Sequence, residues 1–237
     1  MANQRDVRTV LRRLKKTFPN PGAMELGDPY RTLVAVMLSA RTRDEQVLKL
    51  LPGFFDAFPD VQMLAQATPK QIELKINTIG MYRQKAKHVK GMAQAIVSKF
   101  RGAIPATMDE LVSLPGVGRK TASVVLVACF GQAAIAVDTH VHRVTNRLGW
   151  IRTKTPEKTE QALLKIVPRD VQRTVNQVFV KFGRYICIPG KSRCWMCPVR
   201  EFCDYQRKNL LEPTDAAAVK VDLIRREQEL ERLRKNV

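Results

Sequence analysis

Four of the five cysteines lie within seventeen residues, and their type and spacing suit a metal centre. The pattern is Cys187-x6-Cys194-x2-Cys197-x5-Cys203. Four thiolates can hold a tetrahedral zinc ion or a cubane iron–sulfur cluster. Two CxxC pairs would favour zinc, whereas this chain has one short pair and an unusually long first loop. The spacing therefore predicts a metal site rather than disulfides, and it favours iron–sulfur over a zinc ribbon.

A glycine-containing turn at residues 114–122 joins two predicted helices. Gly116 and Gly118 permit a turn that side chains would block, and they let backbone N–H groups approach a ligand closely. The second helix presents unpaired N–H donors and the positive end of its dipole, which together suit a phosphate oxygen. A simple helix–turn–helix packing motif explains the glycines equally well. Arg119 and Lys120 begin this helix, where cations oppose the dipole. A bound phosphate or a neutral, nucleophilic lysine amine would explain the placement, and an ordinary surface lysine is the alternative.

A second candidate catalytic group, Asp138, stands between an apolar approach and another predicted helix. It is expected to cap that helix, and a capping carboxylate can also face a cleft. His140 and His142 are two residues apart, so a helix would point them in different directions. We expect them to be structural or to face DNA rather than to bind a metal together.

The loop between the first two cysteines carries Lys191 and Arg193. We therefore expect the metal site to brace a loop that binds phosphate, with a mainly structural contribution to stability. The fifth cysteine, Cys129, lies in an apolar run and is expected to be a buried, inert thiol.

The charge of the chain points to a polyanionic partner. Lys and Arg number 41 against 22 Asp and Glu, a net charge of +19. Residues 206–237 hold eight basic and six acidic side chains, so the rest of the chain carries +17. The surplus therefore belongs to the folded body, and nucleic acid is the usual partner of such a surface. A basic ribosomal-type protein or a membrane-surface protein is the alternative on charge alone.

The chain shows no sign of secretion or membrane insertion. Its start becomes charged before any apolar segment, unlike a signal peptide. The longest apolar run, residues 122–137, is interrupted and is shorter than the ~20 residues that a span needs. We expect a soluble, cytoplasmic protein that does not contact a membrane.

The elements that must position these residues are predicted to be short helices. Proline and glycine recur at short intervals, and no segment alternates convincingly like a strand. Residues 82–100 have apolar positions at helical spacing. Helix starts are expected at Asp44, Thr68, Thr107 and Thr155, which can act as N-caps. The pattern predicts a compact all-α fold.

Together these motifs resemble endonuclease III of the helix–hairpin–helix DNA glycosylase superfamily. LPGVGRKTASVV resembles its hairpin, AVDTHVHRVTNRLG its aspartate segment, and the cysteine spacing its [4Fe–4S] signature. The resemblance extends from about Asp28 to Cys203.

The resemblance implies a two-lobed fold with a six-helix barrel-like domain and an iron–sulfur cluster domain. The first would be residues 22–132, with the helix–hairpin–helix at about 108–130. The second would combine residues 1–21 and 133–205. Residues 206–237 would be a charged extension with no inherited role.

The resemblance also implies an activity, namely a bifunctional DNA glycosylase and AP lyase of base excision repair. Such an enzyme removes oxidised pyrimidines from double-stranded DNA and then nicks the abasic site. Lys120 would form a Schiff base with the sugar before β-elimination. Asp138 would accept a proton or stabilise positive charge on the sugar.

The expected partner is double-stranded DNA containing damaged bases or abasic sites. The protein is expected to be a monomer in a bacterial or archaeal cytoplasm, where its DNA binding would associate it with the nucleoid. Arg41 and Met81 align with residues that wedge into DNA, where many relatives carry glutamine and leucine. The departure leaves lesion range and opposite-base preference open. The predicted DNA contacts are Arg41, Met81, Gly116, Gly118, Arg119, His140, Lys191 and Arg193.

Two other functions remain compatible with parts of the pattern. A monofunctional mismatch glycosylase of the same superfamily would lack a lysine at this hairpin position, so Lys120 argues against it. A helix–hairpin–helix DNA-binding module without enzymatic activity would not need both Lys120 and Asp138.

Overall fold

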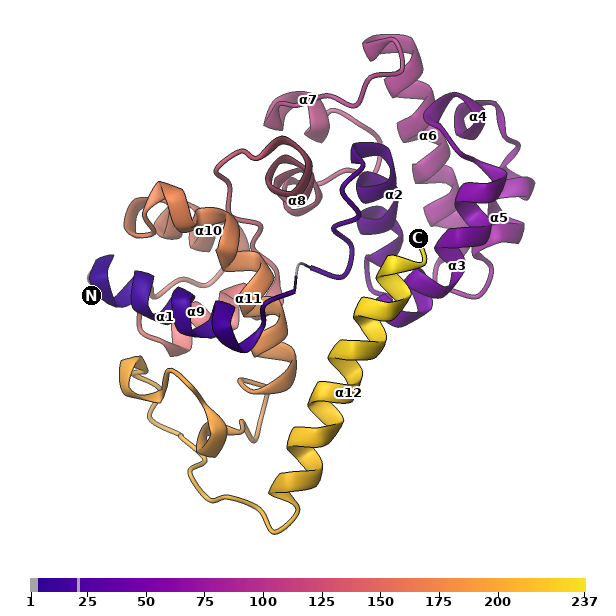
Figure 1. Cartoon of the computed structure of the whole chain (residues 1–237). Coiled ribbons are helices and arrows are strands. Elements are labelled where there is room, and N and C mark those ends of the chain that lie inside the picture. The colour runs from indigo at the N-terminus through magenta and orange to yellow at the C-terminus, as the bar shows by residue number, and fades with distance from the viewer. Residues whose placement is uncertain (1–3, 21) are drawn as a thin grey trace. The chain divides into compact units, whose positions relative to one another are not determined.

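The computed structural model describes residues 4–20 and 22–237, and its regular elements are helices (Figure 1). No strand occurs in this described part of the chain, which confirms the all-α prediction. Among the same residues, no helix is long and apolar enough to cross a membrane.

The chain divides into two compact units. One comprises residues up to Gly22 together with Gln132–Arg226, and the other comprises Ala23–Gly131 and Glu227–Val237. Residues 206–237, predicted to be a separate extension, are divided in the structure: their first part belongs to one unit and their last eleven residues to the other.

The unit that contains Ala23–Gly131 is built around α2, whose residues from Thr32 to Leu38 are all buried. A helix that is apolar on every side is expected in the middle of a fold. Helices α3 and α8 pack against α2, while α4 and α5 pack against α6. The helices of this unit are α2 (Pro29–Ser39), α3 (Asp44–Ala57), α4 (Val61–Gln66), α5 (Pro69–Ile76), α6 (Tyr82–Phe100), α7 (Met108–Val112) and α8 (Arg119–Phe130).

Side-chain caps explain where several of these helices begin. The predicted caps Thr68 and Thr107 accept hydrogen bonds from backbone N–H groups of α5 and α7. The prediction for Asp44 is wrong: Arg43 is the N-cap of α3 and makes no side-chain cap, and Asp44 is the first helical residue. Its carboxylate still lies at the positive end of the helix dipole, where negative charge is favourable.

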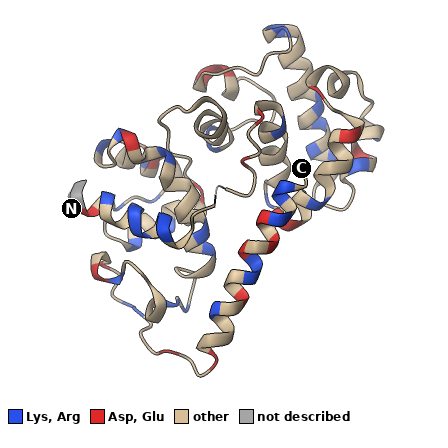
Figure 2. Cartoon of the chain, in the orientation of Figure 1, with Lys and Arg blue, Asp and Glu red and all other residues tan. Residues whose placement is uncertain are grey.

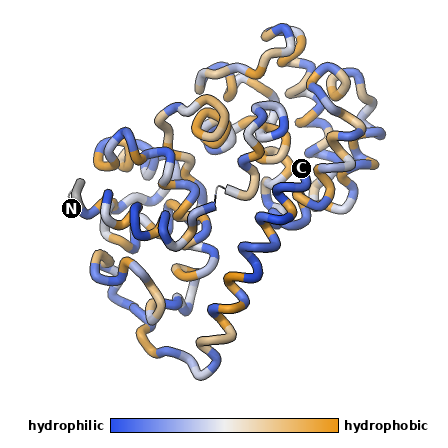
Figure 3. The backbone as a smooth tube through the Cα atoms, in the orientation of Figure 1, coloured by the Kyte–Doolittle hydropathy of each residue, from blue (hydrophilic) through white to orange (hydrophobic). Residues whose placement is uncertain are grey.

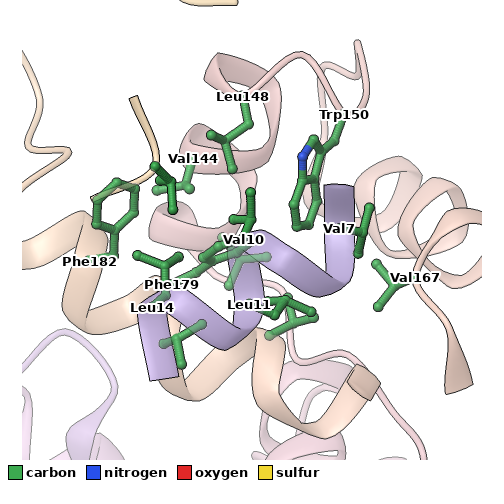
Figure 4. Packing of buried hydrophobic residues seen from close by; sticks show 14 of the residues in the cluster. Val7, Val10, Leu11, Leu14, Val144, Leu148, Trp150, Val167, Phe179 and Phe182 are labelled. Atoms are coloured by element: carbon green, nitrogen blue, oxygen red, sulfur yellow. The ribbon is translucent and has the colours of Figure 1, made fainter. Parts of the chain in front are cut away.

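The other unit has a core formed mainly by α1, α9 and α11 (Figure 4). Leu11 and Leu14 of α1 and Phe179 of α11 are almost fully buried there, and the Trp150 ring lies 5.3 Å from that of Phe179. Each fully buried large side chain stabilises the folded state by about 1.5–3 kcal/mol. The elements of this unit are α1 (Gln4–Thr17), α9 (Thr139–Arg147), α10 (Pro156–Ile166), η1 (Arg169–Val171), α11 (Gln172–Tyr185), η2 (Cys194–Met196) and η3 (Arg200–Phe202).

The charged C-terminal segment forms one helix, α12 (Ala216–Lys235). Basic and acidic residues alternate along it (Figure 2), and its first half is the more hydrophobic (Figure 3). In its second half Leu230 is buried, and Arg234 pairs with Glu231 at 2.6 Å. The guanidinium of Arg31 on α2 donates to the carbonyl oxygen of Val237.

Candidate functional site

The hairpin between α7 and α8 is anchored by two buried side chains and exposes the lysine that follows it. Leu114 and Val117 are buried, and the Val117 N–H donates to the Leu114 carbonyl at 3.1 Å. Lys120 is exposed at the second position of α8. The turn therefore presents its amine at a helix N-terminus.

The two hairpin glycines have different structural roles. Gly116 has a φ of +75°, and a Cβ added there would lie 2.7 Å from the Cβ of His88 on α6. Both its backbone angle and the close approach of α6 therefore require glycine. Gly118 has a φ of −93°, and beyond its neighbours in the chain no described residue comes within 4 Å of an added Cβ. The turn itself does not require this second glycine, contrary to the prediction, so its missing side chain leaves room for a ligand.

No side chain caps the N-terminus of α8, where Gly118 is the N-cap. The same is true of α3, which follows Arg41, and of α6, which follows Met81. Most other helices whose caps are described here begin with a capping Asp or Thr side chain. These three uncapped ends lie beside predicted DNA contacts, and uncapped N-termini bind anions such as phosphate. The N-terminus of α11 also lacks a side-chain cap, but it continues directly from η1.

The two predicted wedge residues both adopt a left-handed backbone. Arg41 has a φ of +55° and Met81 a φ of +57°, and both side chains are exposed. A non-glycine residue in this conformation costs roughly 1–2 kcal/mol. Among the described residues, the other non-glycine case is Arg101, which terminates α6 and so has an ordinary capping explanation. Arg41 directly follows Ala40, the C-cap of α2, where a left-handed residue is common but is usually glycine. Met81 stands at the start of α6 and has no such capping role, and strain at an exposed position of this kind is typical of functional sites.

Asp138 caps α9, as the sequence predicts. Its Oδ1 accepts hydrogen bonds from the backbone N–H groups of His140 and Val141, each at 2.9 Å. Both bonds end on Oδ1, so Oδ2 takes no part in the cap. The side chain is half-buried, and one carboxylate can therefore fix the helix and still offer an oxygen for chemistry.

His140 packs against α11 rather than projecting freely. A Cβ added at Gly183 would lie 2.9 Å from the His140 Cβ and 3.0 Å from Nη2 of Arg143. The Arg143 guanidinium also lies 3.2 Å from His140 Nδ1 and donates to the carbonyls of Gly183 and Cys187. Burial lowers the pKa of His140. The histidine is thus built into the packing of α9 on α11.

Arg147, one turn beyond Arg143, reaches the cysteine segment directly. Its Nη1 donates to Cys187 Sγ at 3.4 Å and to Ser192 Oγ at 2.7 Å. Neither Arg143 nor Arg147 was among the residues predicted from the sequence. Their spacing of four residues, which places them on one face of α9, is the signal that could have found them.

The four clustered cysteines lie close enough to influence one another. Burial raises the pKa of the Cys197 thiol to about 12, and the negative charges of the other three act in the same direction. Four thiolates gathered here thus need a positive group between them, which fits a metal cluster. No three His, Cys, Asp or Glu side chains within the described ranges converge as they would around one metal ion. A multi-iron cluster holds its thiolates farther apart than one ion does.

The two basic residues of the first cysteine loop point in different directions. Lys191 is exposed, next to Gly190 with a φ of +67°. Arg193 is half-buried, and its Nη1 donates to the Tyr185 carbonyl at 2.8 Å. Lys191 is therefore the better placed of the two to meet a phosphate, while Arg193 fastens the loop to the end of α11.

The predicted site residues are divided between the two units. Asp138, His140, Lys191, Arg193 and the four cysteines belong to one of them. The other contains the candidate nucleophile and the remaining predicted DNA contacts, which are Lys120, Arg41, Met81, Gly116, Gly118 and Arg119.

Comparison with known proteins is consistent across sequence and structure. A family model described as HhH-GPD superfamily base excision DNA repair protein matches residues 34–169. Endonuclease III of Thermotoga maritima is 42% identical over 202 residues, which cover 85% of this chain and 94% of that protein.

Solved structures similar to this chain are also DNA repair enzymes of these kinds. A trapped endonuclease III–DNA covalent intermediate, in an estranged-adenine complex, is 36% identical with a TM-score of 0.78, covering 86% of this chain and 97% of that one. A thermostable thymine-DNA glycosylase is 25% identical with a TM-score of 0.76, covering 85% of this chain and 96% of the other.

Proposed function

Because the chain belongs to the HhH-GPD superfamily of base excision DNA repair proteins, and within it to the endonuclease III family, we propose that it repairs DNA as a glycosylase and AP lyase. Its partner is double-stranded DNA that contains damaged bases or abasic sites. The observation that carries the proposal is the likeness to an endonuclease III covalently trapped on DNA, combined with an exposed lysine at the hairpin.

The chemistry assigned to Lys120 is nucleophilic. Its neutral amine attacks the sugar carbon that bears the damaged base, and the base leaves with the electrons of the broken glycosidic bond. Loss of a proton from nitrogen and opening of the sugar ring give an iminium, which is the Schiff base. Removal of the neighbouring sugar proton then expels the 3′ phosphate by β-elimination, and water releases the lysine.

Asp138 is proposed to assist through Oδ2. A carboxylate there can accept the proton lost from the attacking amine or stabilise positive charge growing on the sugar. The cap on Oδ1 holds the group in place, because two backbone N–H groups of α9 bind that oxygen.

The proposed DNA contacts serve to hold an opened duplex. The uncapped ends of α3, α6 and α8 offer N–H groups to phosphates. Arg41 and Met81, exposed and conformationally strained, would occupy the space from which the base is flipped, a step that costs a few kcal/mol. Oxidised pyrimidines are the proposed lesions, on the strength of the family alone.

We assign the four cysteines to a [4Fe–4S] cluster, which fits the mutual effect of their thiols and the guanidinium of Arg147 beside Cys187. When bound, the cluster would cross-link the segment from Cys187 to Cys203 as a structural staple. Purified protein should contain iron and sulfide and absorb near ~400 nm. A colourless protein with stoichiometric zinc would overturn this assignment.

The test of the lyase is borohydride trapping on duplex DNA with an abasic site. The unaltered chain should give a covalent protein–DNA adduct, and Lys120→Ala should give none, because the amine that forms the iminium is gone. Lys158→Ala, at an exposed position of α10, is the matched control and should trap normally. An adduct that persists in Lys120→Ala would refute the assigned nucleophile.

The similarity to a thymine-DNA glycosylase supports a second candidate, a monofunctional mismatch glycosylase. Such an enzyme would remove thymine from a mismatch and leave an intact abasic strand that alkali then cleaves. Base release without a borohydride adduct would favour it.

A further inference from the structure

Lys85, on the second turn of α6, is a buried lysine whose ammonium group binds two neutral oxygens. Its side chain is among the buried polar groups, with a relative exposure of 7%. The Nζ donates to the Leu38 carbonyl at 2.8 Å and to Thr42 Oγ1 at 2.5 Å. A buried charge needs such partners, since an unpaired one is strongly unfavourable.

The two oxygens lie on either side of Arg41. Leu38 is in the last turn of α2, where carbonyls have no helical partner and where a cation is favoured by the helix dipole. Thr42 lies directly after Arg41, and its N–H donates to the Ser39 carbonyl at 3.0 Å. Lys85 thus fastens both ends of the short segment that holds Arg41 in its left-handed conformation.

The backbone of the same residue is bonded to the other strained position. The Lys85 N–H donates to the Met81 carbonyl at 3.0 Å, which is the first helical hydrogen bond of α6. Met81 is the left-handed N-cap of that helix, and no side chain caps it. One residue therefore holds Met81 through its main chain and the Arg41 segment through its side chain.

We propose that Lys85 is a positioning residue that sets Arg41 and Met81 at a fixed separation, so that the two side chains enter the DNA together when a base is flipped. The inference rests on the proposed glycosylase function. It predicts that loss of Lys85 slows the reaction on substrates in which a base pair must be opened. The reaction on substrates whose sugar is already accessible should change little.

The main test replaces the ammonium by a side chain of similar length, Lys85→Met. Base excision from duplex DNA, measured under single turnover, should fall about 10- to 100-fold, because small misplacement of positioning groups has effects of that size. Cleavage of a single-stranded oligonucleotide with a preformed abasic site should fall less than about 3-fold. A 2-aminopurine placed opposite a tetrahydrofuran abasic analogue should show weaker unstacking when the variant binds.

Lys90→Met is the matched control on the same helix. The Lys90 Nζ also donates to a carbonyl at a helix end, that of Ala67 after α4, at 2.5 Å, but this contact is remote in sequence from both strained residues. It should lower stability without separating duplex from single-stranded activity. Equal losses on both substrates in Lys85→Met, or the same pattern in Lys90→Met, would overturn the inference.

Thr42→Val gives a test that leaves the buried charge in place. It removes one acceptor of Lys85 and should weaken duplex excision selectively, while Thr42→Ser should restore it. Equal activity of the two Thr42 variants on duplex DNA would also contradict the inference. If the unaltered chain neither excises bases nor forms a borohydride adduct, the proposed function fails instead.

Discussion

Helices α8 and α9 carry the two candidate catalytic side chains, and they begin in opposite ways. At α9, Asp138 places negative charge at the positive end of the dipole and pairs two backbone N–H groups. At α8, Arg119 and Lys120 place positive charge there, and no side chain caps the helix. The α9 end is capped by a side chain of the protein, whereas the α8 end has no side-chain cap and is proposed to bind a DNA phosphate.

The difference means that stability and function are coupled at α9 and separate at α8. Loss of the Asp138 carboxylate removes both a helix cap and a candidate catalytic group. Lys120 is exposed, so its removal should leave the free energy of unfolding within about 0.5 kcal/mol of its original value. The buried face of α8, from Ala122 to Leu126, supplies the stability that its N-terminus lacks.

The sharpest way to separate the two roles at α9 is to compare two substitutions of Asp138. Asp138→Asn keeps a capping oxygen, so its free energy of unfolding should lie within about 0.5 kcal/mol of the original value. Asp138→Ala loses the cap, and its free energy of unfolding should fall by about 1–2 kcal/mol. Both should lower single-turnover base excision by about 10²- to 10⁴-fold, because both remove the charge. Urea unfolding and excision assays measure the two effects, and an Asn variant with full activity would break the comparison.

The hairpin glycines test the corresponding separation at α8. Gly116→Ala should lower the free energy of unfolding by about 1–4 kcal/mol. The alanine would have to adopt the positive φ of this position, and its methyl group would contact His88 too closely. Gly118→Ala should leave stability within about 0.5 kcal/mol, because both its φ and the space around it accept a methyl group.

For DNA affinity the order of the two variants should be reversed: Gly118→Ala should have a larger effect than any Gly116→Ala protein that folds. Gly118→Ala should weaken binding to an uncleavable abasic duplex, since its methyl group occupies the surface offered to phosphate. Normal DNA affinity in Gly118→Ala would show that the open space beside this residue is not used by a ligand.

The smallest expected effect is a pH dependence that belongs to the α9 end. Burial lowers the pKa of His140 in the folded chain, so the unfolded chain takes up a proton more readily. The free energy of unfolding should therefore fall as the pH drops through the ordinary histidine value near 6.5, and the loss is complete below the folded pKa.

His140→Asn should reduce this dependence of the free energy of unfolding on pH between about pH 7.5 and 5, because asparagine cannot take up the proton. His88→Gln, beside the hairpin, is the comparison variant and leaves His140 in place. Unfolding in urea at several pH values measures both variants, and identical pH dependence in the two would contradict a role for the half-buried imidazole of His140.

Much of this organisation was predictable from residues close together in the chain. The helix at 82–100, the threonine caps and the cap by Asp138 depend on hydrogen bonds within one turn. The close approach of His88 to Gly116 and the open space beside Gly118 were not predictable, because both depend on how α6 packs near the hairpin.

The wedge residues are a second case in which local sequence did not predict the structure. Arg41 and Met81 were identified only through resemblance to a family, and nothing in their local sequence indicated a left-handed backbone. The failed prediction of a cap at Asp44 has a local cause, since Asp is nearly as favourable in the first turn as at the cap.

By itself, the sequence determined the chemistry available at each helix start and in the cysteine segment, because spacing along a helix decides which groups share a turn. The tertiary structure decided which distant groups hold these in place. Lys85 reaches the Leu38 carbonyl across 47 residues, and Arg147 reaches the Cys187 thiol across 40. Such contacts arise only once buried helix faces have selected their partners, so no local pattern encodes them.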